Sequence, residues 1–321
     1  MNLERIILHI GRHKSGTSSL QKSLSSNADL LASAGILYPR YGRNGKIAHH
    51  AIAESLNPKS RQPKLDPEQI AKGISLERQR GEETIIISSE AFQNISELSL
   101  LKRLITILKP DQIMIICYFR EYLDYAVSSY RQYIHANSQY VDFKKYIKRR
   151  FNSMECFINN WRQIGNLKIK WFDVQTLLGN DIVVDFLKTS EIDLQIPTQR
   201  MNPSIGGDLL FLKLLYNFKN RQLLDYNQLS EICSIRPEWS SPFRISDAVA
   251  SELRDDSDYN HSLIKELGDV RHKSFAHYDS LPTGQINETL LQCLETNYNF
   301  SIKENLIKKI NAGKFSHLLD L

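Results

Sequence analysis

The segment from Arg5 to Gln21 constrains the fold of this 321-residue chain more than any other. It begins with an apolar, β-branched run, residues 6–10, which predicts a buried strand. The run ends at Gly11, and a helical pattern begins after Gly16. Two glycines separated by four residues, between a strand and a helix, are typical of a loop that holds phosphate with backbone N–H groups and the helix N-terminus. The sequence therefore predicts an anion-binding loop at the end of a strand.

The lysine of this loop stands in an unusual position. In the common nucleoside-triphosphate version, the second glycine is followed by Lys and then by Ser or Thr. Here Thr17 follows Gly16, and the lysine lies inside the loop as Lys14. The loop thus has the spacing for phosphate, but its cation position argues against an ordinary ATPase.

Strands and helices alternate through the first 170 or so residues. Such alternation predicts an α/β fold in which a central parallel sheet is flanked by helices, with sites at the carboxyl ends of the strands. The predicted strands are residues 6–10, 84–88, 112–119 and 167–172, and the predicted helices are residues 17–34, 67–80, 97–108, 122–135 and 154–164.

Two regions depart from this alternation. Residues 38–66 form an irregular insertion with a short helical piece around 49–56, which is typical of a lid, a binding loop or a disordered loop. After Pro197 the pattern is mainly helical, with predicted helices at 205–220, 246–254, 259–267, 285–298 and 303–311. We expect these helices to pack onto the sheet, giving one domain over residues 1–321, with an α/β core at about 1–200 and a helical part at about 201–321.

Composition excludes several classes of protein. A hydrophobic content of 41% with 24% charged residues is typical of a soluble globular chain. No apolar run is long enough for a membrane helix, so we do not expect an integral membrane protein. Aromatic and basic residues are not interleaved, and a net charge of +5 is small, so a nucleic-acid partner is not expected either. The charge suits an anionic ligand, but a slightly basic surface without function would explain it equally well.

Cysteine usage predicts a cytoplasmic protein with reduced thiols in its core. The four cysteines are far apart and show no Cys-x-x-Cys spacing: Cys117, Cys156, Cys233 and Cys293. The chain enters its first predicted strand without an apolar leader. The late histidines, His272, His277 and His317, are spaced too irregularly for a metal site.

The loop sequence resembles that of a known family. Residues 13–21 read His-Lys-Ser-Gly-Thr-Ser-Ser-Leu-Gln, which closely resembles the 5′-phosphosulfate loop of sulfotransferases that use 3′-phosphoadenosine-5′-phosphosulfate (PAPS). The resemblance is strongest to a bacterial branch in which His-Lys-Thr-Gly-Thr-Thr-Ser-Leu-Gln is usual. It implies a P-loop-like three-layer fold, PAPS as the sulfuryl donor and no metal, because Lys14 supplies the charge that Mg²⁺ supplies in kinases.

The resemblance also implies roles for the loop residues. Lys14 would reach the bridging oxygen and offset the charge that forms on the departing phosphate. The 5′-phosphate would be held by the rest of the loop: Arg12, His13, Ser15, Gly16, Thr17 and Ser18. The alternative is a lysine that is merely solvated on a tight turn.

A second anchor follows the third predicted strand. In the family, an Arg followed eight residues later by a Ser holds the 3′-phosphate of PAPS, and Arg120 with Ser128 matches that spacing. A guanidinium fork suits phosphate oxygens. The alternative is that Arg120 pairs with a local carboxylate, either Glu121 or Asp124.

The general base has three candidates. Glu90 lies just past the second predicted strand, where family members that act on glycans often place a glutamate. His49 and His50 lie in the insertion and compete with it, because histidine titrates near working pH. Alternatively, Glu90 sits at a helix N-terminus because of the dipole, and the two histidines lie on a surface helix.

Weaker resemblance reaches to about residue 267. Residues 161–173 and 181–187 look like the family's fourth strand and following helix, which implies that Phe172 lines the adenine pocket. Residues 200–204 and 258–260 resemble segments of the bacterial branch, which implies that Arg200 reaches the 3′-phosphate. The Arg-Lys-Gly loop of some cytosolic members is not present, and the tail from about residue 273 matches nothing.

Together these residues predict an enzyme, a PAPS-dependent sulfotransferase whose acceptor is a hydroxyl on a saccharide, lipopolysaccharide or glycolipid. Six cations of the insertion could meet an acidic saccharide, although a solvated charged loop explains them equally well: Arg40, Arg43, Lys46, Lys59, Arg61 and Lys64. The main alternative is a Mg²⁺-dependent P-loop kinase of a small molecule or nucleotide, which the missing lysine after Gly16 and the Arg120–Ser128 pair disfavour. A binding protein without activity is a third hypothesis.

Overall fold

The computed structural model describes residues 2–62, 64–147, 153–173, 175–199, 205–240, 250–251, 257–269 and 286–319. These residues belong to two compact units, which we describe separately. The sheet unit comprises residues 1–120, 154–201 and 262–268, and the helical unit comprises residues 121–153, 202–261 and 269–321. The expectation of one domain over the whole chain stays a prediction.

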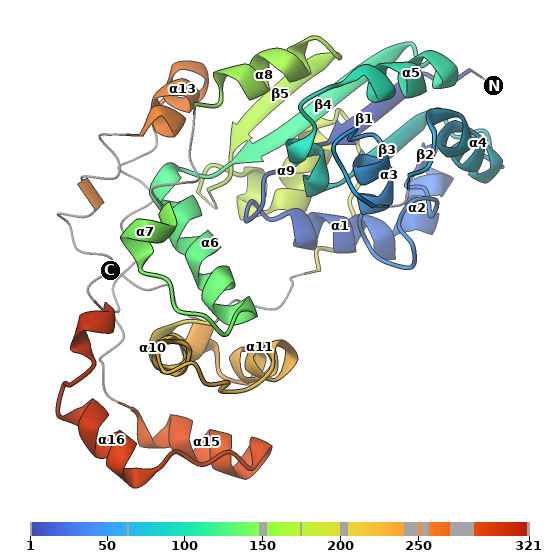
Figure 1. The fold of residues 1–321 in the computed structure, drawn as a ribbon. Coiled ribbons are helices and arrows are strands. Elements are labelled where there is room, and N and C mark those ends of the chain that lie inside the picture. Colours follow the sequence, from blue (N-terminus) through green and yellow to red (C-terminus); the bar gives the residue numbers. More distant parts are fainter. Residues whose placement is uncertain are drawn as a thin grey trace. The chain divides into compact units, whose positions relative to one another are not determined.

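The sheet unit is built on five parallel strands in the order β2-β3-β1-β4-β5 (Figure 1). They are β1 (Arg5–His9), β2 (Ile36–Leu37), β3 (Thr84–Ser88), β4 (Gln112–Phe119) and β5 (Asn166–Trp171). The predicted α/β fold with a parallel sheet is confirmed. Strands β3 and β4 have the predicted bounds, β1 and β5 begin and end one residue earlier than predicted, and the two-residue β2 is too short to show a period in the sequence.

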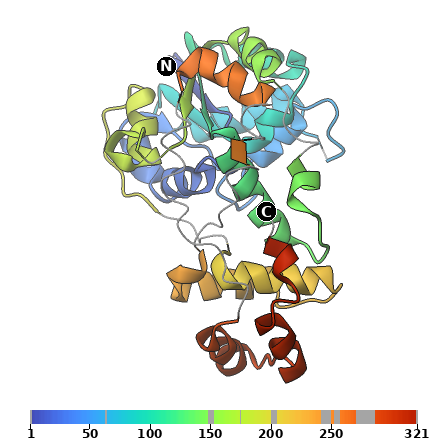
Figure 2. The same ribbon diagram turned by 90° about the vertical axis from the view of Figure 1, so that its left-hand side faces the viewer.

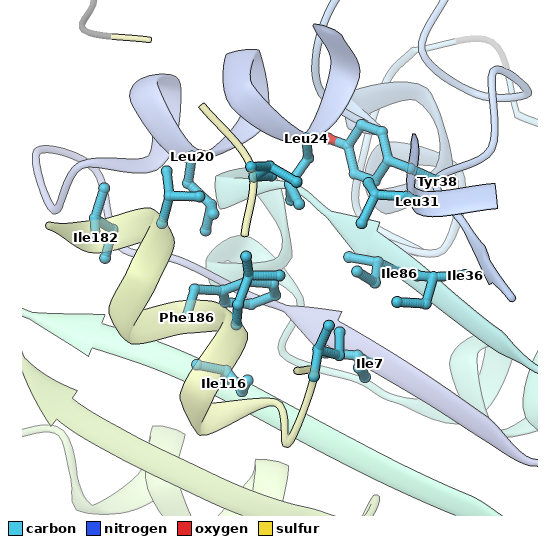
Figure 3. Close-up of a cluster of buried hydrophobic side chains, with 14 of the residues drawn as sticks. Ile7, Leu20, Leu24, Leu31, Ile36, Tyr38, Ile86, Ile116, Ile182 and Phe186 are labelled. Atoms are coloured by element: carbon cyan, nitrogen blue, oxygen red, sulfur yellow. The ribbon is translucent and has the colours of Figure 1, made fainter. Parts of the chain in front are cut away.

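One face of the sheet is covered by α1 (Thr17–Ser26), α2 (Ala28–Ser33) and α9 (Ile182–Thr189). Leu20 of α1 and Phe186 of α9 point into a buried cluster with Ile7, Ile86 and Ile116 of the strands (Figure 3). The predicted helix 17–34 is interrupted at Asn27, whose side chain donates to the Ser23 carbonyl at 2.8 Å. Burial on this face fixes α1, and with it the start of that helix beside the end of β1.

The opposite face packs against other helices. Phe119 at the end of β4 meets Phe157 of α8 (Glu155–Arg162) with ring centroids 5.8 Å apart. The remaining helices of this unit are α3 (His50–Ser55), η1 (Glu90–Asn94), α4 (Pro67–Glu77), α5 (Ser99–Leu108) and η2 (Leu178–Asn180). Helix α4 begins with a capping box between Asp66 and Gln69, which makes its start the best defined of these helices.

The helical unit contains α6 (Tyr122–Ala136), α7 (Phe143–Ile147), α10 (Gly207–Phe218), α11 (Tyr226–Ile235) and η3 (Pro237–Ser240). It also contains α15 (Glu288–Tyr298), α16 (Glu304–Asn311) and η5 (Ser316–Leu319), which Figure 2 shows in red. Helix α13 (Asp258–Leu267) contributes residues to both units. The sequence did not predict α11, although Asp225 and Gln228 form a capping box at its start. The predicted helix 246–254 lies mostly outside the described residues.

The prediction of core cysteines is only half right. Cys117 and Cys233 are buried, whereas Cys156 is exposed on α8 and Cys293 is partly exposed on α15, because both lie on outward faces of amphipathic helices. All four are free thiols. None of the described helices combines the length and the apolar character needed to cross a membrane.

Candidate functional site

Three segments of the candidate site meet at one edge of the sheet. His9 of β1 pairs in register with Ser88 of β3 and with Ile116 of β4. Because the strands are parallel, the loop after β1, Glu90 after β3 and Arg120 after β4 leave the sheet at the same edge. The sequence analysis predicted this convergence.

The loop from Gly11 to Gly16 is a tight turn that leads into the open end of α1. The Ser15 hydroxyl donates to the Arg12 carbonyl at 2.5 Å, and Lys14 has a left-handed φ of 68°. Gly16 is the N-cap of α1, no side chain caps this helix, and its first turn carries no acidic residue. The first N–H groups of α1 therefore have no partner within the helix, and the helix dipole favours an anion in front of them.

Phe172 connects this loop with Arg120. A Cβ at Gly16 would collide with the Phe172 ring, and Gly16 also has a φ of 74°, so only glycine fits here. The Arg120 guanidinium lies 4.8 Å from the centroid of the same ring. Its Nε is buried and has no hydrogen-bond partner among the described residues. A cation stacked on an aromatic ring with an unsatisfied donor is suited to an anionic ligand.

Glu90 is held in its ionised form by its neighbours. Burial by itself would raise the pKa of this carboxyl, but the Gln21 amide donates to Oε2 at 3.0 Å, and His50 Nε2 lies 3.8 Å from Oε1. Together with the nearby His13 side chain, these contacts lower the Glu90 pKa below its ordinary value. Glu90 also begins the short helix η1, so the interpretation as a helix-start residue holds alongside its place at the site.

The two histidines of the insertion have different environments. His49 is fully buried, with Nε2 2.9 Å from the Pro39 carbonyl and Nδ1 accepting from the Ser88 N–H at 3.1 Å. Burial lowers its pKa to about 4, so it is neutral near pH 7 and both ring nitrogens are occupied. The interpretation of His49 as a surface residue is wrong, because the insertion folds it onto β3. His50 begins α3, is partly exposed, and lies beside Glu90.

His9 and Gln21 were missed by the sequence analysis. His9 is fully buried at the end of β1, with Nδ1 2.7 Å from the Ser88 hydroxyl and Nε2 without a partner among the described residues. Its ring lies beneath the loop, since a Cβ on Gly11 would come within 3.0 Å of Nε2. Burial lowers the His9 pKa to about 4. In the sequence, His9 is marked only as a polar residue within the predicted strand 6–10, and Gln21 only as the last residue of the loop motif 13–21.

The other predicted site residues are placed as follows. Thr17 is buried and Arg12 partly buried, whereas His13 and Ser18 are exposed. Ser128 belongs to the helical unit, where it is partly buried on α6, so its pairing with Arg120 stays a prediction. Arg200 lies outside the described residues.

The insertion cations are mostly solvated. Arg40, Lys46, Lys59, Arg61 and Lys64 are exposed. Arg43 is instead buried, because its guanidinium lies 5.2 Å from the Tyr38 ring centroid and donates to the Ser25 hydroxyl. The interpretation as a solvated charged loop is therefore wrong for Arg43.

No protein-family model matches this chain, and no curated protein matches it. Among the described residues, no group of three or more His, Cys, Asp and Glu side chains is placed to hold a metal ion.

Proposed function

We propose that this protein is a PAPS-dependent sulfotransferase with a P-loop-like fold, which transfers the sulfuryl group to an acceptor hydroxyl. One observation carries the proposal: the Lys14 loop and the uncapped start of α1 lie at the same sheet edge as Arg120 and the ionised Glu90. The edge thus combines anion-binding groups with a proton acceptor, and the sequence of the loop resembles the sulfotransferase motif.

Several residues at the edge support the proposal of PAPS as the ligand. The backbone of the Gly11–Gly16 loop and the first turn of α1 would hold the 5′-phosphosulfate. Arg120 would hold the 3′-phosphate, because its buried Nε has no partner among the described residues. Ser128 and Arg200 are proposed as further contacts of the 3′-phosphate, and Phe172 as a wall of the nucleotide pocket.

The chemistry requires two groups from the protein. PAPS supplies an activated sulfuryl group, whose transfer releases the 5′-phosphate as a charged product. Lys14 would offset the charge on that phosphate, as cations do in phosphoryl transfer. Glu90, or in its place His50, would accept the proton of the acceptor hydroxyl, and Glu90 is available as a carboxylate because its pKa is lowered. No metal is required in this scheme.

The acceptor class rests on the insertion. Its exposed cations favour an acidic saccharide, a lipopolysaccharide or a glycolipid precursor, modified in the cytoplasm. The insertion reaches the proposed base, since His50 of α3 lies beside Glu90. We propose no nucleic-acid partner.

The proposal is tested by thermal unfolding with 3′,5′-adenosine bisphosphate, compared with ADP and Mg²⁺. A ligand at about a hundred times its dissociation constant adds roughly 2.7 kcal/mol to stability. We expect stabilisation by the bisphosphate in the wild type and in Arg103→Ala, a control at an exposed arginine, and its loss in Arg120→Ala. Stabilisation by ADP with Mg²⁺ alone would overturn the proposal in favour of the kinase.

A further inference from the structure

A histidine and a carboxylate lie close enough for one oxygen atom to bridge the gap between them. His50 Nε2 and Glu90 Oε1 are 3.8 Å apart, which is too long for a direct hydrogen bond. An oxygen about 2.7 Å from both atoms would see them at an angle of roughly 90°, within the broad range of hydrogen-bond directions. Both side chains are reached by solvent, with 36% of His50 and 16% of Glu90 exposed, so a ligand atom can enter.

The surroundings determine which ring nitrogen of His50 carries the proton. Nδ1 lies 2.8 Å from the Ser89 hydroxyl, and that hydroxyl already accepts from the Ala91 N–H at 3.1 Å. The Ser89 hydroxyl can donate its proton to Nδ1 or accept from Nδ1–H with its second lone pair, so this contact permits either tautomer. A bare Nε2 lone pair would face the Glu90 carboxylate and be repelled by it, so the neutral ring carries its proton on Nε2.

The gap thus has a donor, Nε2–H, on one side and an acceptor, Oε1, on the other. A hydroxyl satisfies both and keeps one lone pair for attack, since its oxygen has one proton and two lone pairs. A neutral amine has one lone pair, which it needs for the new bond to sulfur, so it cannot accept from Nε2–H at the same time.

We propose that His50 selects a hydroxyl rather than an amine as the sulfuryl acceptor, a role that rests on the proposed function. In the transfer, the acceptor O–H bond breaks and its proton goes to Glu90. The oxygen forms a bond to sulfur with one lone pair while the other accepts from Nε2–H of His50. The bond from sulfur to the 5′-phosphate oxygen breaks, and its electron pair remains on the phosphate.

The geometry is tested in the protein without nucleotide or acceptor. Nitrogen NMR of labelled histidine, with His50 identified by the signal lost in His50→Gln, is expected to show the Nε2–H form near pH 8. Gln21, His50 and His13 lower the Glu90 pKa, and the charge of Glu90 also acts on the buried His9 and Tyr38. His50→Gln removes one of the groups that lower the Glu90 pKa, so it is expected to raise that pKa toward its ordinary value. The exposed His261→Gln is the control. An Nδ1–H form, or an unchanged Glu90 pKa in His50→Gln, would overturn the inference.

The selectivity is tested with a glucosamine oligomer, which offers amines and hydroxyls on the same ring. We expect sulfate on oxygen in the wild type, and a product carrying N-sulfate would overturn the role of His50. The proposed function and the role of His50 can fail independently. Failure of the bisphosphate to stabilise the protein counts against the proposed function, whereas the NMR measurements depend only on the His50–Glu90 geometry.

Discussion

At the scale of single residues, the candidate site depends on a backbone conformation that side chains other than glycine do not tolerate. Gly16 has a φ of 74°, and the ring of Phe172 occupies the space where its Cβ would be. The Arg120 guanidinium stacks on the same ring. A change at Gly16 therefore disturbs both the turn and the stacking of Arg120.

Gly16→Ala is expected to destabilise the protein more than Gly45→Ala. Both glycines have a φ of about 75°, so an alanine at either position is destabilised by about 1–2 kcal/mol because its backbone must be left-handed. A Cβ at Gly45 would meet no atom within 4 Å. Overpacking against Phe172 adds roughly 1–3 kcal/mol at Gly16. Urea unfolding measures the loss of stability, and a bisphosphate binding assay measures the disturbance of the loop and of Arg120. Equal losses of stability in the two variants would contradict the packing of Phe172 on Gly16.

At the scale of elements, the sequence predicted what lies next to strand ends and missed what depends on tertiary packing. Strands β1, β3 and β4 are long apolar runs, so the loop, Glu90 and Arg120 could be placed at their ends. Residue spacing could not tell His49 from His50, because the insertion buries one and leaves the other partly exposed. The contact between Gln21 and Glu90 joins residues 69 positions apart, which no local pattern indicates.

Asp185 joins several elements through one buried carboxylate. It lies on α9, is 1% exposed, and accepts Lys170 Nζ of β5 at 2.7 Å and the Tyr118 hydroxyl of β4 at 2.7 Å. It also accepts the Leu178 N–H of η2 at 3.0 Å. One side chain thus fixes α9 and η2 to the two strands that end beside Arg120 and Phe172.

Asp185→Asn is expected to cost about 2–3 kcal/mol, because the amide keeps the shape but cannot accept from all four donors, the fourth being the Thr189 hydroxyl at 3.3 Å. The value is set below that of a fully buried pair because Lys170 is 35% exposed and its charge can still reach water. Denaturant unfolding measures the loss. Glu191→Gln, which changes a carboxylate that is 62% exposed, is the control and should leave the midpoint unchanged. A loss of stability no larger than that of the control would show that the hydrogen bonds of Asp185 do not stabilise the fold.

At the scale of the whole molecule, two fully buried histidines make the stability of the folded state depend on pH. His9 and His49 both contact Ser88 at the end of β3, and burial lowers the pKa of each from 6.5 to about 4. In the unfolded chain the same residues take up protons below pH 6.5. Between pH 6.5 and 4 the unfolded state therefore binds more protons than the folded state, and stability falls as pH falls. Glu90 adds a loss at lower pH, since its lowered pKa favours folding only while it is ionised.

Each histidine contributes a slope of up to about 1.4 kcal/mol per pH unit in this window. We expect His49→Gln, whose amide can donate to the Pro39 carbonyl and accept from the Ser88 N–H, to lower the slope by about that amount. The measurement is urea unfolding across the window by tryptophan fluorescence, in a Trp239→Phe background. The remaining Trp161 and Trp171 lie in the sheet unit together with both histidines, so the signal reports on the part that titrates. The same slope in His49→Gln and in the background protein would mean that His49 is protonated in the folded state. That result would contradict the burial of the neutral His49 ring.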